Sequence, residues 1–134
     1  MSEQTPANTG NAVWPILRIT TLATDEAVVC RVEGEIDQAQ QAKLENALAR
    51  AVRDRPPQLV VDLAGVTFCD SSGLNTFLQT LQDTTLAGTR LVLAALSPQI
   101  RRLLEITSTD ELFTIRDNVH AALHTDRPHQ RGRP

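Results

Sequence analysis

Hydrophobic and polar residues follow two different periods along the chain, which separate short strands from longer helices. Residues 16–22 are rich in Ile, Leu and Thr, and residues 27–33 alternate between the two faces of a half-buried strand. The polar turn at 24–26 is short enough to join these segments as an antiparallel hairpin. The chain is therefore expected to begin its fold with two paired strands.

A longer segment at 38–53 has its apolar residues at helical spacing. Asp37 precedes it in the position of an N-cap, and Gln40 lies where a capping box needs its second member. Pro56 and Pro57 end the segment because proline cannot continue a helix. The expected buried stripe is Leu44, Ala47, Leu48, Ala51 and Val52.

The rest of the chain repeats strand and helix. The continuous apolar run 59–63 predicts a buried strand, followed by a short turn at 64–68. A helix over 71–84, stopped by Ala87-Gly88, and a strand over 90–96 are expected next. Ser97 is expected to cap a third helix, whose inward residues are Ile100, Leu103, Leu104 and Thr107. A strand over 112–115 then leads to a last helix, which Asp117 is expected to cap and whose inward residues are Val119, Ala122 and Leu123.

This order, ββαβαβαβα, predicts an α/β fold with helices packed on a mixed, mostly parallel sheet. We expect one domain over residues 13–125, with a flexible lead at 1–12 and a flexible basic tail at 126–134. Functional residues of such sheets gather at the carboxyl ends of the strands. The loops at 34–37 and 64–73 follow neighbouring strands and are expected to meet at that edge.

Composition and charge limit the classes of function that the chain is expected to have. The 134 residues are 41% hydrophobic but only 3% aromatic, so aliphatic side chains must build the core. The net charge of −3 gives no reason to expect nucleic-acid binding, and no apolar run is long enough to cross a membrane. No signal peptide is visible. Cys30 and Cys69 lie in separate apolar runs, so we expect two buried free thiols in a reducing compartment, the cytoplasm.

The candidate chemistry lies at Ser71 and Ser72, where a strand and turn lead into a helix. A helix N-terminus attracts anions, including a phosphate carried by a serine, although a serine here is also an ordinary helix cap. Catalysis is not expected, because the histidines (His120, His124 and His129) lie in the last helix and the tail, and no G-x-S-x-G pattern is present. The spacing of His and Cys predicts no metal site, and no cofactor motif is present.

Four motifs in one order carry a resemblance to a known family. They are Gly34-Glu35-Ile36-Asp37, the run 59–63, Asp70-Ser71-Ser72-Gly73-Leu74, and Ser97-Pro98 followed by Arg101-Arg102-Leu103-Leu104. Over about residues 16–124 the chain resembles STAS domains, specifically the bacterial anti-sigma factor antagonists.

The resemblance implies a protein that switches partners. In that family the unmodified antagonist binds an anti-sigma factor, which is also a serine kinase, and so releases a sigma factor. The kinase phosphorylates the serine after the motif aspartate, here Ser71, and a PP2C-type phosphatase restores it. The resemblance therefore implies phosphorylation of Ser71 and a partner-binding surface formed by Asp37, Asp70, Ser71, Ser72, Gly73 and Asn75.

Three positions depart from the family pattern, and one alternative stays open. Asn75 stands where a small residue is usual, Ser108 replaces a frequent glycine, and Cys69 replaces a larger apolar residue. Asn75 matters most, since it lies one turn after Ser71 and bears on the choice of partner. The alternative function is a non-phosphorylated STAS accessory or scaffold subunit of a lipid-transport complex or a stress-sensing assembly.

Overall fold

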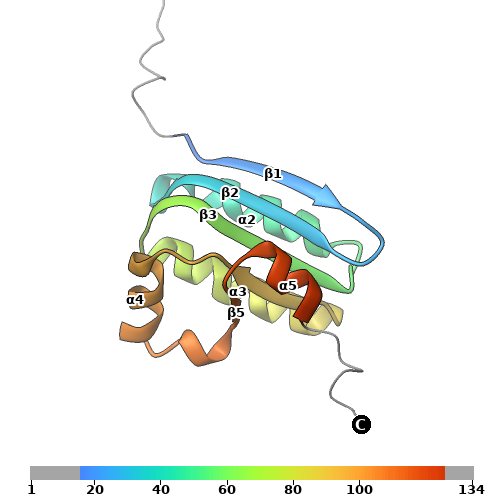
Figure 1. Cartoon of the computed structure of the whole chain (residues 1–134). Helices are drawn as coiled ribbons and strands as arrows, with labels where there is room; N and C mark the ends of the chain where they lie inside the picture. Colours follow the sequence, from blue (N-terminus) through green and yellow to red (C-terminus); the bar gives the residue numbers. More distant parts are fainter. Residues whose placement is uncertain (1–15, 126–134) are drawn as a thin grey trace, which may run out of the picture.

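The structure is a computed structural model that describes residues 16–125, so the predicted lead at 1–12 and tail at 126–134 lie outside it. Five strands form one sheet in the order β1-β2-β3-β4-β5 (Figure 1). Strand β1 pairs with β2 antiparallel, and every other pairing is parallel. The strands are β1 (Arg18–Ala23), β2 (Val28–Ile36), β3 (Gln58–Cys69), β4 (Arg90–Ala94) and β5 (Thr114–Arg116). The predicted mixed sheet with an antiparallel first hairpin is confirmed.

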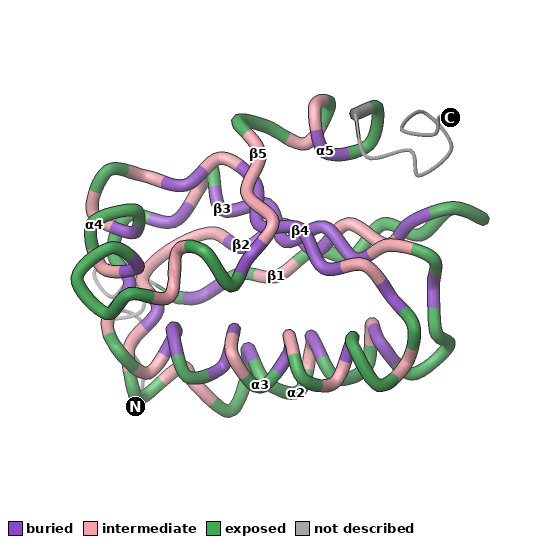
Figure 2. The backbone as a smooth tube through the Cα atoms, turned by 90° about the horizontal axis from the view of Figure 1, so that it is seen from below, coloured by how far each residue is buried: buried purple, intermediate pink, exposed green. Residues whose placement is uncertain are grey.

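Helices cover both faces of the sheet, but unequally. Figure 2 shows α2 and α3 side by side under one face and α5 on the other. The helices are α2 (Gln41–Val52), α3 (Ser71–Ala87), α4 (Pro98–Ile106) and α5 (Val119–Thr125), with short 3-10 turns η2 (Gln38–Gln40) and η3 (Asp110–Leu112). Within residues 16–125, none of the helices is long and apolar enough to cross a membrane.

The larger core lies between the sheet and the α2–α3 layer. Leu44 and Leu48 of α2 and Phe77 of α3 are fully or almost fully buried there, against Cys30 and Val32 of β2. Burying one such aliphatic or aromatic side chain stabilises the fold by about 1.5–3 kcal/mol. A smaller core under α5 contains Val60, Val92, Ala94 and Ala122. The predicted division of β2 between two faces is confirmed.

Strand β3 is longer than the sequence pattern predicted. It continues through residues 64–68, where we expected a turn, and β2 continues to Ile36 beside it. The expectation was wrong because two register shifts, between Arg31 and Glu33 and between Gly34 and Glu35, let the two strands stay paired past their glycines. Gly34 has φ +112, a conformation that side chains disfavour, and this explains a glycine inside a strand.

Hydrogen bonds at the helix starts test the predicted caps. The Asp37 carboxylate accepts the Gln40 N–H at 3.2 Å, although it caps the η2 turn that leads into α2. Ser97 accepts the Ile100 N–H at 3.2 Å, as predicted. Both caps come from residues with short polar side chains, which satisfy the free N–H groups of a first turn.

The predictions for the C-terminal part need four corrections. The last strand, expected over 112–115, is β5 (Thr114–Arg116), because Leu112 belongs to the η3 turn. Asn118, rather than Asp117, accepts the Ala121 N–H at 2.7 Å at the start of α5. Thr107 is exposed, because its hydroxyl donates to backbone carbonyls of its own helix end. Leu123 is 37% exposed, so α5 buries Ala122 but not the whole expected face.

The two cysteines are buried and free, as predicted. Burial raises the pKa of both thiols, and it raises that of Cys69 to about 12, with the Asp70 carboxylate as a smaller second cause. A hydrogen bond with Thr21 acts in the opposite direction on the pKa of Cys30. Both side chains therefore stay protonated at neutral pH and pack as small apolar groups.

This arrangement predicts slow thiol labelling. Because burial raises the pKa of both thiols, the folded protein contains much less reactive thiolate at about pH 8 than the unfolded chain does. We expect both cysteines to react with an aromatic disulfide reagent at the rate of unfolding, and at once in denaturant. Rapid labelling of either thiol in the native protein would contradict the buried placement.

Candidate functional site

Two strand ends meet at the carboxyl edge of the sheet. Ile36 of β2 and Cys69 of β3 are the last paired residues of their strands. One residue further on, the Asp70 N–H donates to the Ile36 carbonyl oxygen at 3.1 Å. Asp37 and Asp70 thus follow neighbouring parallel strands at one edge, as the sequence predicted for these two loops.

The start of α3 is fixed by Asp70. Its Oδ1 accepts the Ser72 N–H at 2.8 Å, and its backbone carbonyl accepts the N–H groups of Gly73 and Leu74 at 3.1 and 3.3 Å. Asp70 is extended, while Ser71 is the first helical residue. The sequence left a serine as the possible cap, and the structure gives that role to the aspartate before it.

The two serines have different surroundings. Ser71 is exposed, whereas Ser72 is half-buried. Both backbone groups of Ser72 are hydrogen-bonded to side chains. Its N–H donates to the Asp70 carboxylate, and its carbonyl accepts the Thr76 hydroxyl at 3.1 Å. Asn75 is also exposed and follows Ser71 by four residues, which places both on the same side of α3. Ser71 and Asn75 therefore form one accessible surface at the start of the helix.

Gly73 allows α3 to approach the strand ends. A Cβ atom at this position would lie 2.4 Å from Cys69 Sγ and 2.7 Å from Ile36 Cγ2, both too close for real contacts. Gly73 is buried, so it lies beneath the surface formed by Ser71. Its place in the motif is explained by close packing of the helix against β2 and β3.

Gln99 is a positioning residue that the sequence did not reveal. Its side-chain amide donates to the Cys69 carbonyl at 2.7 Å and accepts the Cys69 N–H at 3.0 Å. It comes from the first turn of α4, and it supplies the hydrogen bonds that a neighbouring strand would give to the end of β3. No periodicity distinguishes a glutamine that bonds in this way from one facing solvent.

Phe68 is the second residue that the sequence analysis missed. It immediately precedes the site and is 42% exposed, although it is one of three phenylalanines in the chain. Exposed aromatic side chains beside polar groups are typical of protein–protein contacts. The sequence analysis placed it in a turn, whereas it lies in β3, where both Thr67 and Phe68 are exposed beside a register shift in the pairing with β2.

The site's chemistry is that of a surface for binding or modification. Asp37 and Asp70 are half-buried carboxylates, and each caps a helical turn. Among residues 16–125, no group of three His, Cys, Asp or Glu side chains is placed to hold a metal ion. His120 and His124 stack on each other in α5, on the opposite face of the sheet from α3, and His129 lies outside the described residues.

The five-stranded sheet, its helix arrangement and the exposed serine that begins α3 after the Asp70 cap together indicate one family of domains. The profile of the STAS domain family matches residues 18–122, and the chain belongs to that family. It is 31% identical over 101 residues to the anti-sigma-B factor antagonist of Staphylococcus aureus, covering 75% of this chain and 94% of the relative.

Solved structures agree with the fold. An anti-sigma factor antagonist from Mycobacterium paratuberculosis is similar with a TM-score of 0.71 and 31% identity, covering 81% of this chain and 92% of that one. The Bacillus cell fate determinant SpoIIAA in its phosphorylated form has a TM-score of 0.65 at 19% identity, covering 84% and 100%. This second likeness concerns the fold alone.

The packing of Gly73 gives a prediction for stability. Gly73→Ala should destabilise the protein by about 1–3 kcal/mol, because the added methyl group has to displace Cys69 or Ile36. The neighbouring change Ser71→Ala should stay within about 0.5 kcal/mol of the parent, since Ser71 is exposed. Chemical denaturation measures both, and equal stabilities would contradict the close approach.

Proposed function

We propose that this protein is an anti-sigma factor antagonist that switches partners through phosphorylation of Ser71. In the unmodified state it binds an anti-sigma factor with serine kinase activity and frees the sigma factor. The observation that carries the proposal is the exposed Ser71 at the first position of α3, at the carboxyl edge of a STAS fold. The names of the relatives support it, since the Staphylococcus aureus and Mycobacterium paratuberculosis relatives, each 31% identical, are named as anti-sigma factor antagonists.

Accessibility favours Ser71 over Ser72 as the phosphate acceptor. A kinase has to bring a hydroxyl group to its bound nucleotide, and the exposed Ser71 meets that need without unfolding the helix. Ser72 is half-buried, with its backbone in two hydrogen bonds. The positive end of the α3 dipole would favour the added negative charge at Ser71.

Phosphorylation would act by local charge. A phosphate adds about −1.5 to −2 charges at neutral pH, beside a site that already has Asp37 and Asp70. A partner surface matched to a neutral hydroxyl would then face repulsion and a bulky group. The fold would stay unchanged, because the side chain of Ser71 is not part of the core.

The proposed partner surface combines the residues implied by family resemblance with Phe68. Ser71, Asn75 and Phe68 are exposed, while Asp37, Asp70 and Ser72 are half-buried at the same strand ends. Gly73 is buried, so we assign it a supporting role beneath this surface in place of direct contact. A PP2C-type phosphatase would restore the hydroxyl. In this proposal the protein is a cytoplasmic regulator without cofactor or catalytic activity.

Three serine variants test the proposal with the cognate kinase. Ser71→Ala should bind the anti-sigma factor and accept no phosphate, whereas Ser72→Ala should still be phosphorylated. Ser71→Glu should weaken binding, although one carboxylate mimics a dianionic phosphate incompletely. Intact mass and phosphopeptide mapping after incubation with the kinase and ATP give the readout. Phosphate on Ser72 alone, or none on the parent protein with an active kinase, would favour the accessory-subunit function.

The variant Asp37→Asn tests the role of Asp37 in binding separately from its role in stability. Asn caps helices about as well as Asp, so Asp37→Asn should change stability by less than about 0.5 kcal/mol. Removal of the charge should change the affinity for the anti-sigma factor by about threefold or more. The same substitution at Asp83, about three turns along α3, is the control and should leave binding unchanged. Normal binding by Asp37→Asn would remove Asp37 from the proposed surface.

A further inference from the structure

Two of the three histidines of the chain form a pair on the exposed side of α5. His120 and His124 are four residues apart, so their side chains lie one above the other on the helix surface. Their ring centroids are 4.3 Å apart, and the ring planes differ by 28°. Both residues are exposed, and α5 lies on the face of the sheet opposite α3 (Figure 2). The proposed phosphorylation switch uses neither of them.

A hydrogen bond fixes the tautomer of one ring. Nδ1 of His124 lies 2.9 Å from the carbonyl oxygen of His120. Because a carbonyl oxygen can only accept, Nδ1 carries the proton, and the lone pair of the neutral ring is on Nε2. Histidines that bind metal ions are commonly held in this way, with one ring N–H on a backbone carbonyl and the other nitrogen on the ion. Within residues 16–125, no hydrogen bond engages the ring of His120, which leaves it able to turn toward the same ion.

The backbone beneath the pair is anchored to the rest of the fold. Ala122, between the two histidines, is fully buried. Its N–H donates to the Asn118 carbonyl at 3.0 Å, and its carbonyl accepts the Gln58 side-chain amide at 3.0 Å. The Asn118 side chain also caps the first turn of α5. Both imidazoles are therefore presented on one side of a fixed helix, and binding an ion would require rotation of the side chains alone.

The separation of the rings is close to what a shared ion needs. A tetrahedral zinc ion binds imidazole nitrogens at about 2.0–2.1 Å, which places two such nitrogens about 3.3 Å apart. The stacked rings have to turn their Nε2 edges toward the ion, and exposed side chains change rotamer within nanoseconds. Asp117 precedes His120 by one turn, but it pairs with Arg101 at 3.7 Å, so we count no carboxylate among the ligands.

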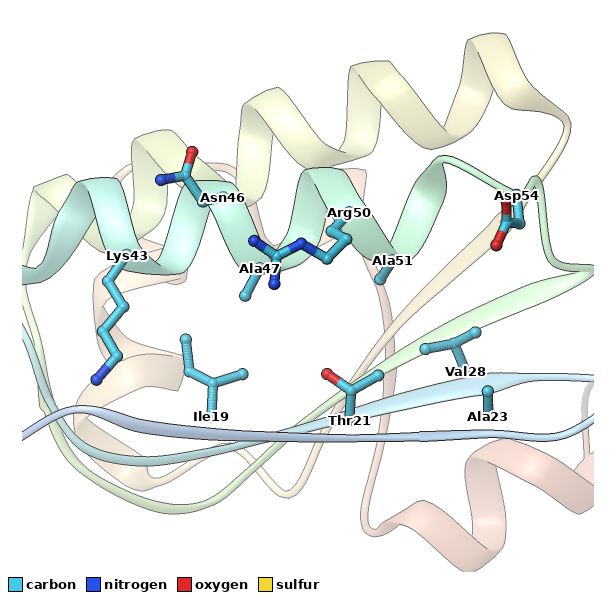
Figure 3. A pocket seen from close by; sticks show the side chains of 10 residues that line it. All are labelled: Ile19, Thr21, Ala23, Val28, Lys43, Asn46, Ala47, Arg50, Ala51 and Asp54. Atoms are coloured by element: carbon cyan, nitrogen blue, oxygen red, sulfur yellow. The ribbon is translucent and has the colours of Figure 1, made fainter.

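The groove between β1 and α2 provides a contrast (Figure 3). It has a volume of about 550 Å³ and contains charged side chains of both signs. Figure 3 shows Lys43, Arg50 and Asp54 spread along the groove, so these groups do not converge on one point. On α5, by comparison, two ligand groups of one kind lie side by side, and their chemistry specifies what they would bind.

We propose that His120 and His124 together bind one Zn²⁺ ion, with water completing its coordination. Imidazole nitrogen suits Zn²⁺, whereas Mg²⁺ and Ca²⁺ take oxygen ligands. Two histidines four residues apart on one helix face are a recurrent zinc-binding pair. Because catalytic and structural sites use three or four protein ligands, this ion exchanges with solution. The ion joins successive turns of α5 and stabilises the helix that covers the smaller core.

Calorimetric titration of the full chain with Zn²⁺ at neutral pH tests the proposal. The parent should bind one ion per chain. His120→Asn and His124→Asn should each weaken binding by about tenfold or more, because one imidazole remains. His129→Asn, at the third histidine of the chain, is the matched control and should bind as the parent does. No binding by the parent, equal affinity in His124→Asn, or a loss in His129→Asn overturns the assignment.

Imidazole NMR gives a readout of the binding atom. Long-range ¹H–¹⁵N spectra should show a shift of His124 Nε2 on addition of Zn²⁺, while Nδ1 keeps its proton. Mg²⁺ at the same concentration should change neither nitrogen. Zinc bound through Nδ1 of His124, or zinc shifts that leave both rings unchanged, contradicts the geometry.

Thermal unfolding provides a third measurement, which does not depend on heats of binding. Zn²⁺ should raise the melting temperature of the parent, because an ion that binds the folded state alone stabilises it. The double variant His120→Asn/His124→Asn should fold, since both side chains are exposed, and Zn²⁺ should not raise its melting temperature. An equal increase in the double variant would show that zinc binds elsewhere.

Discussion

The hydrogen bond from the Asp70 N–H to the Ile36 carbonyl, at 3.1 Å, is the constraint on which the site depends. It joins the ends of two parallel strands and places the loop after β2 beside the start of α3. This approach is possible only because Gly73 has no side chain, since a Cβ would meet Cys69 and Ile36. The conformation of the motif is therefore determined by backbone packing, and the exposed serine is carried on a rigid support.

The residues that hold the end of β3 in place lie beneath the surface that phosphorylation would modify. Gln99 ties both backbone groups of Cys69, and Cys69 itself is fully buried with a pKa raised to about 12. None of these contacts involves the hydroxyl group of Ser71. A charge added there would change what the surface attracts or repels while leaving the packed layer intact, which is the physical basis for a local switch.

The sequence predicted those features that local chemistry controls. The periodicity of Leu44 and Leu48 and the cap at Ser97 depend on near neighbours, and the structure confirms them. The length of β3 and the amide of Gln99 depend on strands and helices far apart in the chain, so local patterns could not show them. The aspartate cap was missed for a related reason, because Asp70, Ser71 and Ser72 are all good caps and only the geometry of the strand end selects one.

The central claim is that phosphorylation of Ser71 would change partner binding without changing the fold. Amide NMR spectra of the ¹⁵N-labelled protein, recorded before and after phosphorylation by the cognate kinase, test it most directly. The account predicts shifted resonances confined to Asp37 and residues 68–76, with the amides of β1, β4 and α5 unchanged. Shifts spread over the whole sheet, or a loss of dispersion, would contradict it.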